Sequence, residues 1–265
     1  MRRPPGEHTL PILDRSPGRK VGLARALSKL GLCSRSQAQV LIRTGRVKLN
    51  GAVRRDPETP VRLGRDRIAL DDCRIRELTK VYFVLNKPRG VVTTASDEKG
   101  RKTVYELLEP DTPWVAPVGR LDKASEGLLL LTNDSEWAAR VSAPESHLEK
   151  TYHVQVATLV NETVLTALLR GVQHDGNVLR AVRADMLRVG HRNSWVEIVL
   201  DEGKNRQIRR MFEALGIEVL SLVRVAIGPV PLGGLLRGQT RTLTRTEKLA
   251  IDRRIAWPDG TNVGW

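Results

Sequence analysis

Cysteine, aromatic residues and long apolar runs are all scarce in this chain. Its 265 residues include two cysteines, Cys33 and Cys73, which form no CxxC pair. This excludes a zinc cluster built on cysteine and a disulfide framework, and we expect both thiols to be buried as small hydrophobic groups. The longest purely aliphatic run covers residues 128–131, far short of the ~20 apolar residues that a membrane helix needs.

Two further signals are missing. The basic N-terminus has no apolar core followed by a small-residue cleavage site, so we read no secretory signal and expect a cytoplasmic protein without a membrane partner. The histidines show no HxxxH or HxH spacing, which gives zinc catalysis no support. They are His8, His147, His153, His174 and His191. We therefore predict no metal site.

Positive charge is abundant. The chain has 44 Lys and Arg against 30 Asp and Glu, a formal net charge of +14. With only 4% aromatic residues, this balance favours a polyanionic partner, usually nucleic acid. The length suits one large domain, or a small domain joined to a larger one. Residues 1–20 hold four prolines and no apolar periodicity, which is typical of a flexible basic arm or of a solvated tail without a role.

The segment after this arm predicts two helices and a hairpin. Leu23, Leu27 and Leu30 share one helical face, and Gly31 ends that helix. Ser34 and Gln37 have the spacing of a capping box that opens a second helix. Residues 46–51 then alternate as a strand and close on Asn-Gly, a strong hairpin signal.

Basic residues stand off the apolar faces of this unit. We expect Arg35, Arg43, Arg46 and Lys48 to form a single surface that contacts RNA phosphates. Residues 21–68 resemble an S4-type RNA-binding domain, since the Ser-Arg before the second helix and the Gly-Arg-Val before the hairpin fall in register. A generic pair of helices with a solvated basic face is the plainer interpretation.

Residues 69–80 mix charges without a period, so we place a linker there. From residue 81 to 250 strands outnumber helices and do not alternate strictly with them, which predicts an α+β domain on a mixed, largely antiparallel sheet with flanking helices. Residues 251–265 are assigned to a C-terminal tail. The expected architecture is a small S4-like domain followed by this larger domain.

One loop of the larger domain stands out. Asp122 lies in GRLDKASEG, which glycines frame and an apolar strand follows. A rigid strand can hold such a loop in place, although a loop aspartate beside Arg and Lys is more often a surface ion pair. Tyr152 begins a predicted strand and could stack on a base; taken alone, it is more typical of sheet core.

A third segment, residues 205–216, predicts an amphipathic helix that ends at Gly216. At about 100° per residue, Arg206 and Arg210 point away from the apolar stripe while Arg209 lies at its edge. An arginine at that edge can reach inward to a carboxylate.

Four ordered motifs, LNKPRGVVTT, GRLDKASEGLLLLTND, KTYHVQV and the segment from Asp201 to Val230, resemble those of ribosomal pseudouridine synthases of the RsuA type, which also carry an S4-type domain. The resemblance covers about residues 21–250. It implies that Asp122 is the catalytic aspartate, that Arg209 pairs with it, and that Tyr152 stacks on the target uracil. Lys87 falls in the first motif, to which we assign a structural role. Ala124 and Ser135 depart from the family pattern, where Asp and Gly are common.

The resemblance therefore implies an enzyme that isomerises a uridine in ribosomal RNA or a pre-ribosomal subunit, with the large subunit favoured over the small. It implies no cofactor, because the isomerisation changes neither oxidation state nor composition. We assign further RNA contacts to Arg120, Lys204 and Arg206, and expect a monomer. A noncatalytic RNA-binding assembly factor is the main alternative, and a basic DNA-binding protein is a weaker one.

Overall fold

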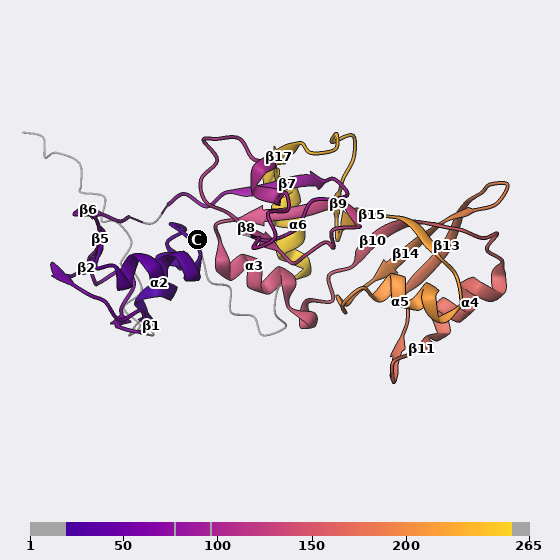
Figure 1. Cartoon of the computed structure of the whole chain (residues 1–265), viewed down its shortest axis with the longest axis horizontal. Coiled ribbons are helices and arrows are strands. Elements are labelled where there is room, and N and C mark those ends of the chain that lie inside the picture. The colour runs from indigo at the N-terminus through magenta and orange to yellow at the C-terminus, as the bar shows by residue number, and fades with distance from the viewer. Residues whose placement is uncertain (1–19, 77, 96, 256–265) are drawn as a thin grey trace, which may run out of the picture. The chain divides into compact units, whose positions relative to one another are not determined.

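The computed structural model describes residues 20–255, apart from residues 77 and 96, and its chain divides into two units between residues 77 and 78 (Figure 1). The basic arm predicted at 1–20 lies outside the described residues except for Lys20, and so does the part of the predicted tail after residue 255. None of the described helices is long and apolar enough to cross a membrane.

The N-terminal unit opens with the two predicted helices, α1 (Leu23–Lys29) and α2 (Arg35–Arg43). Ser34 caps α2 through the expected capping box, in which its hydroxyl accepts from the Gln37 N–H and the Gln37 side chain accepts from the Ser34 N–H. The helices bury their apolar faces against one another and against the strand that follows. Both helix predictions are confirmed.

The strands of this unit extend beyond the predicted hairpin. They are β1 (Val21–Gly22), β2 (Val47–Leu49), β3 (Ala52–Val53), β4 (Pro60–Val61), β5 (Ile68–Leu70) and β6 (Cys73–Arg74). β2 and β3 form the hairpin, and the four-stranded order is β3-β2-β5-β6. The linker predicted at 69–80 was therefore wrong for its first part, because β5 and β6 close the sheet of this unit. Cys33 is buried as expected, whereas Cys73 is exposed.

The second unit is built on a nine-stranded sheet with the order β13-β14-β10-β15-β9-β7-β17, to which β8 and β16 add at β9 and β15. Its strands are β7 (Tyr82–Lys87), β8 (Ala116–Val118), β9 (Glu126–Thr132), β10 (Lys150–Val156), β13 (Arg183–Val189), β14 (Ser194–Leu200), β15 (Val219–Ile227), β16 (Val230–Pro231) and β17 (Thr240–Thr242). All pairs are antiparallel except β9 with β15. The predicted α+β class with a largely antiparallel sheet is confirmed.

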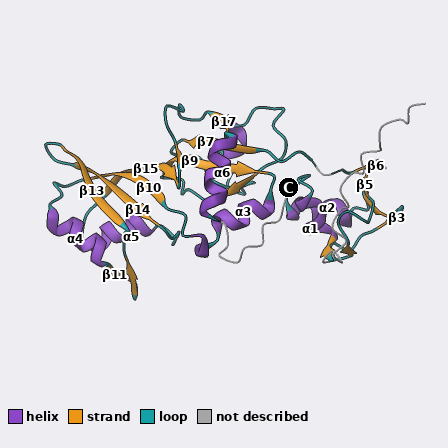
Figure 2. Ribbon diagram, turned by 180° about the vertical axis from the view of Figure 1, so that it is seen from behind, coloured by secondary structure: helices purple, strands orange, loops and turns teal. Residues whose placement is uncertain are grey.

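Helices cover the two ends of this sheet separately, as Figures 1 and 2 show. α3 (Ser135–Ser142) and α6 (Arg245–Arg254) pack on β7 and β9, while α4 (Glu162–Arg170) and α5 (Gln207–Ala214) pack on β10 and β14. The small hairpin of β11 (Val172–His174) and β12 (Asn177–Leu179) lies beside α5. Short 3₁₀ helices span Val104–Leu107 and Pro144–Ser146. Because Ile251 and Ile255 are buried in the core, residues 251–255 belong to the folded unit and not to a tail.

The parallel pair β9 and β15 joins the two halves of the sheet. Gly127 faces Arg224 in this pair with a φ of +104°. A Cβ at position 127 would lie 2.3 Å from the Arg224 carbonyl oxygen, so only glycine lets the two backbones approach this closely. The Asp122 loop precedes β9 and therefore emerges at this junction.

Candidate active site

The loop that carries Asp122 connects β8 to β9 and is held through its backbone carbonyls. Each carbonyl from Arg120 to Ser125 accepts a hydrogen bond from a group outside the loop. The donors, in the order of the carbonyls, are Arg224, the Thr93 hydroxyl, the Lys87 ammonium, the Gly90 N–H, Arg209 and again Lys87. Bonds from cationic donors are roughly twice as strong as neutral ones. The backbone of the loop is thus fixed on all its carbonyls while its side chains are left for other contacts.

Lys87 is the central anchor of this arrangement. Its side chain is fully buried, and Nζ donates to the carbonyls of Ser125 at 2.8 Å, Asp122 at 3.0 Å and Pro88 at 3.2 Å. Three acceptors use the three protons of an ammonium group. Burial lowers the pKa of Lys87 to about 8, although the nearby Asp122 charge opposes the shift. Lys87 can therefore hold the turn around Asp122 in its protonated form at neutral pH.

Asp122 and Arg209 come from different elements and meet at this loop, but not in the way predicted. The Arg209 guanidinium donates to the carbonyls of Ala124 at 3.0 Å and Val219 at 3.2 Å. Among the described residues, none donates a hydrogen bond to the half-buried Asp122 carboxylate. The expected direct pair is replaced by an indirect one, in which Arg209 binds the backbone two residues beyond the aspartate.

Electrostatics still couples Arg209 to its surroundings. Burial lowers the pKa of Arg209, the positive charges of Arg206 and Arg89 lower it further, and the Asp122 carboxylate raises it. Arg89 itself is exposed and donates to the Leu220 carbonyl at 3.4 Å. The Arg209 guanidinium therefore has two other guanidinium groups and one carboxylate as charged neighbours, and an excess of positive charge attracts a polyanion.

Tyr152 lies near the start of β10, between Ile198 of β14 and Arg224 of β15. The tyrosine is half-buried and packs against two of the apolar clusters of this unit, one on each half of the sheet. It is thus part of the sheet core, as the plainer interpretation held, and it also stands at the junction from which the Asp122 loop emerges. Its position is compatible with a stacking platform.

The start of α5 presents two further predicted residues. Arg206 precedes the helix in a left-handed conformation, with a φ of +47°, so it is not one of the helical positions that the sequence pattern implied. Lys204 is exposed and forms an ion pair with Glu202 at 2.9 Å. Arg206 and Arg209 line an open depression of about 430 Å³ together with the loop after α5. Arg120 is exposed.

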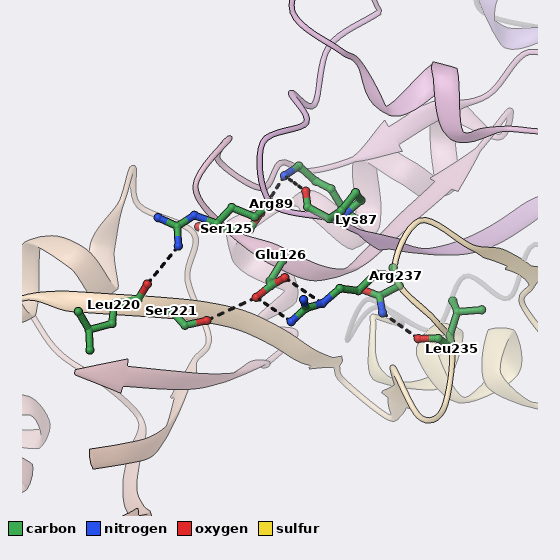
Figure 3. A network of polar contacts seen from close by, with 10 residues as sticks. Lys87, Arg89, Ser125, Glu126, Leu220, Ser221, Leu235 and Arg237 are labelled. Atoms are coloured by element: carbon green, nitrogen blue, oxygen red, sulfur yellow. Dashed lines mark hydrogen bonds and ion pairs between the residues drawn. The ribbon is translucent and has the colours of Figure 1, made fainter. Parts of the chain in front are cut away.

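Sequence reasoning missed a polar network centred on Glu126, the first residue of β9 (Figure 3). Its side chain is 10% exposed and meets the Ser221 hydroxyl at 3.4 Å and Arg237 Nε at 3.3 Å. The network ties β9 to β15 and to the loop before β17. No sequence signal could have found it, because Ser221 and Arg237 lie about a hundred residues from Glu126 in the chain.

In the N-terminal unit the predicted basic surface is only partly free. Arg35 and Arg43 are exposed. Arg46, however, is bound by Asp71, which its Nε contacts at 3.0 Å, and Lys48 is bound by Asp72. The hydrogen bonds from Arg46 hold the pKa of the Asp71 carboxyl below its usual value. Two of the four predicted RNA contacts, Arg46 and Lys48, thus have carboxylate partners within the unit, and their role in RNA binding stays a prediction.

No group of three or more His, Cys, Asp or Glu residues in the described ranges could hold a metal ion. The chemistry within reach of Asp122 is that of a carboxylate among guanidinium and ammonium groups. A carboxylate can act chemically as a nucleophile or as a base.

Comparisons with known proteins agree with this arrangement. A family model described as RNA pseudouridylate synthase matches residues 81–214, and a model of the S4 domain matches residues 21–68. A crystal structure of a pseudouridylate synthase is 33% identical, with a TM-score of 0.62, and the alignment covers 87% of this chain and 99% of that one.

Two relatives match this chain over nearly their whole length. The "Ribosomal large subunit pseudouridine synthase B" of Bacillus subtilis is 37% identical over 227 residues, which cover 85% of this chain and 93% of that protein. An uncharacterised RNA pseudouridine synthase of Aquifex aeolicus is 36% identical over 237 residues, 89% of this chain and 95% of the relative. The chain belongs to the RNA pseudouridylate synthase family, in the group whose catalytic domain follows an S4 domain.

Proposed function

We propose that this protein isomerises a uridine of ribosomal RNA to pseudouridine, with Asp122 as the catalytic carboxylate, Tyr152 as the platform for the uracil and Arg209 as the residue that orients the aspartate. The observation that carries the proposal is the Asp122 loop. All its carbonyls from 120 to 125 are bound, while the carboxylate itself has no donor among the described residues.

The reaction needs a carboxylate that is held in a fixed position. The bond between ribose C1′ and uracil N1 breaks, the base turns within the site, and C1′ bonds to uracil C5, which loses its proton as N1 gains one. Three roles suit Asp122: attack at C1′, attack at C6, or removal of the proton on C2′. Each requires an ionised carboxylate, and Asp122 has the cations Lys87 and Arg209 as charged neighbours.

The target base must also leave its stack before a side chain can reach C1′, which costs a few kcal/mol. Stacking on an aromatic ring contributes ~1–3 kcal/mol per base and offsets part of this cost. The half-buried ring of Tyr152 at the sheet junction suits that role. Reactions of this kind conserve both oxidation state and composition, so the proposed chemistry uses no cofactor.

RNA contacts come from both units in this proposal. Arg89, Arg120 and Arg206 bind phosphates near the site, with Lys204 beside them. Arg35 and Arg43 supply free cations on the N-terminal unit, to which Arg46 and Lys48 add when RNA displaces their carboxylate partners. The large ribosomal subunit is the substrate, by analogy with the Bacillus subtilis relative, and the reaction takes place in the cytoplasm.

Tritium release tests the function directly. Large-subunit and small-subunit ribosomal RNA labelled with tritium at uracil C5 are incubated with the protein, both as naked RNA and as immature subunits. We expect release from the large-subunit substrate alone, followed by mapping of a single new pseudouridine. Release from the small-subunit substrate alone would reassign the target, and no release from any substrate would favour a noncatalytic assembly factor.

A further inference from the structure

Arg224 lies at the centre of the sheet junction. In the strand register it faces Tyr152 of β10 on one side and Gly127 of β9 on the other. One residue of β15 thus separates the proposed uracil platform from the strand that carries the Asp122 loop. Any change in the spacing of these strands at Arg224 changes the distance between the two proposed functional groups.

The side chain of Arg224 is buried, at 5% exposure, and its contacts bracket the loop. Nε donates to the Leu128 carbonyl at 2.7 Å, and Nη1 donates to the Arg120 carbonyl at 3.4 Å. One guanidinium therefore binds the backbone before Asp122 and the backbone after it. The planar fork of arginine can make both contacts at once, which the single ammonium of lysine does less well.

A contribution to folding stability alone does not account for this arrangement. Within the described residues, Arg224 has no carboxylate partner, and its Nη2 is buried without a hydrogen bond. A buried charge without a counter-ion is destabilising, and an apolar side chain of similar size is often more stable in its place. Its positive charge also disfavours the protonated forms of the neighbouring Lys87 and Lys150, lowering the pKa of each after the larger effect of burial.

We propose that Arg224 is a positioning residue for the isomerisation: its guanidinium fixes the Asp122 loop relative to Tyr152 by holding the carbonyls of Arg120 and Leu128. The proposal rests on the proposed function, since it takes Asp122 and Tyr152 as the reacting carboxylate and the base platform. Arg224 acts through these two groups and not on the RNA.

The test compares Arg224→Met and Arg224→Lys with Arg241→Met. Arg241 is an arginine of the same unit that binds Glu247 at 2.7 Å and the carbonyls of Thr242 and Pro231 at 3.3 Å, none of which belongs to the loop. Single-turnover tritium release, RNA affinity and thermal stability are measured for each, below the melting temperature of the weakest variant. A misplacement of about 1 Å can cost ~10²-fold in rate, so we expect both Arg224 variants to lose about that much in rate with RNA Kd changed by less than about threefold. Arg241→Met should lose stability but keep its rate.

The positioning role would be overturned if both Arg224 variants fold and react as fast as Arg241→Met. It would also be overturned if the Arg224 variants lose RNA affinity by the same factor as rate. If Arg224→Met does not fold, Arg224→Lys decides, because it keeps the charge and loses the fork. Wild-type protein that releases no tritium would overturn the proposed function instead, and the inference with it.

Discussion

The two units of this protein use basic residues in opposite ways. In the N-terminal unit Arg46 and Lys48 are held by Asp71 and Asp72 in exposed ion pairs. In the second unit, called the catalytic unit from here on, Lys87 and Arg224 are buried. They donate to backbone carbonyls of the Asp122 loop and its flanks. Exposed pairs contribute little to stability and are screened by salt. Buried cations that donate to carbonyls fix a backbone conformation, so the second arrangement sets local geometry while the first does so only weakly.

The largest effect should follow from filling the space at the sheet junction. We expect Gly127→Ala to destabilise the catalytic unit by about 4 kcal/mol or more, a size reserved for severe steric or backbone strain. The reasons are the φ of +104° and the approach of a Cβ to 2.3 Å from the Arg224 oxygen. Urea unfolding measures the loss.

Gly234→Ala is the matched control, because a Cβ there meets nothing within 4 Å and its φ is outside the left-handed region. It should leave the unfolding free energy within about 1 kcal/mol of the wild type. A Gly127→Ala variant as stable as this control would mean that the two strands do not approach as the structure has them.

The next effect concerns Lys87 and pH. Its pKa of about 8 in the fold predicts that the single-turnover rate of the wild type falls as pH rises through that value, because the neutral amine has too few protons for its three carbonyls. Lys87→Met should be slower at neutral pH by about tenfold or more, the cost of unpaired buried acceptors, and should lack this decline. A pH profile of tritium release gives both results.

Stability provides a second readout of the same group. The pKa of Lys87 is lowered in the fold from 10.5 to about 8, so between these values the unfolded chain binds more protons and wild-type stability should gain with rising pH. Lys87→Met should lose this gain, whereas Lys102→Met, at an exposed lysine of the same unit, should keep it. Identical profiles for the two variants would contradict the buried, protonated anchor.

The smallest effect should appear in the N-terminal unit. Asp71→Asn frees Arg46, and asparagine suits the left-handed φ of +47° at this turn. We expect RNA binding to tighten by about two- to fivefold, the size of an exposed ion pair, and the salt dependence to steepen by about one phosphate contact.

Asp56→Asn controls for the loss of one negative charge, since the Asp56 carboxylate accepts only from the Glu58 backbone N–H among the described contacts. RNA affinity that rises equally in both variants would assign the change to net charge and not to a released Arg46. Affinity that falls for Asp71→Asn would show that the pair itself supports the binding surface.

Much of the fold could be predicted because its signals are local. The capping box of Ser34 and Gln37, the Asn50-Gly51 turn and the apolar run of β9 each depend on residues close in sequence. The apolar face of α5 was equally clear. Strands of two or three residues gave no such signal, and residues 69–74, which hold most of β5 and all of β6, were therefore taken for part of a linker.

The site could be located from its motifs but not assembled from them. Arg209 was expected to bind the Asp122 carboxylate, whereas it binds the Ala124 carbonyl. Arg224 and Glu126 depend on contacts made across the parallel strand pair, which no local pattern encodes. The ion pairs of Arg46 and Lys48 likewise join residues about 25 positions apart.

The central claim of the proposed function is that Asp122 is the catalytic carboxylate. Tritium release from large-subunit ribosomal RNA labelled at uracil C5, measured for wild type and Asp122→Asn together with the affinity of each for the same RNA, tests it most directly. We predict release by the wild type and none by Asp122→Asn, with affinities within about threefold, because the substitution removes the reactive carboxylate and few phosphate contacts. Undiminished release by Asp122→Asn, or an equal loss of release and of binding, would contradict the account.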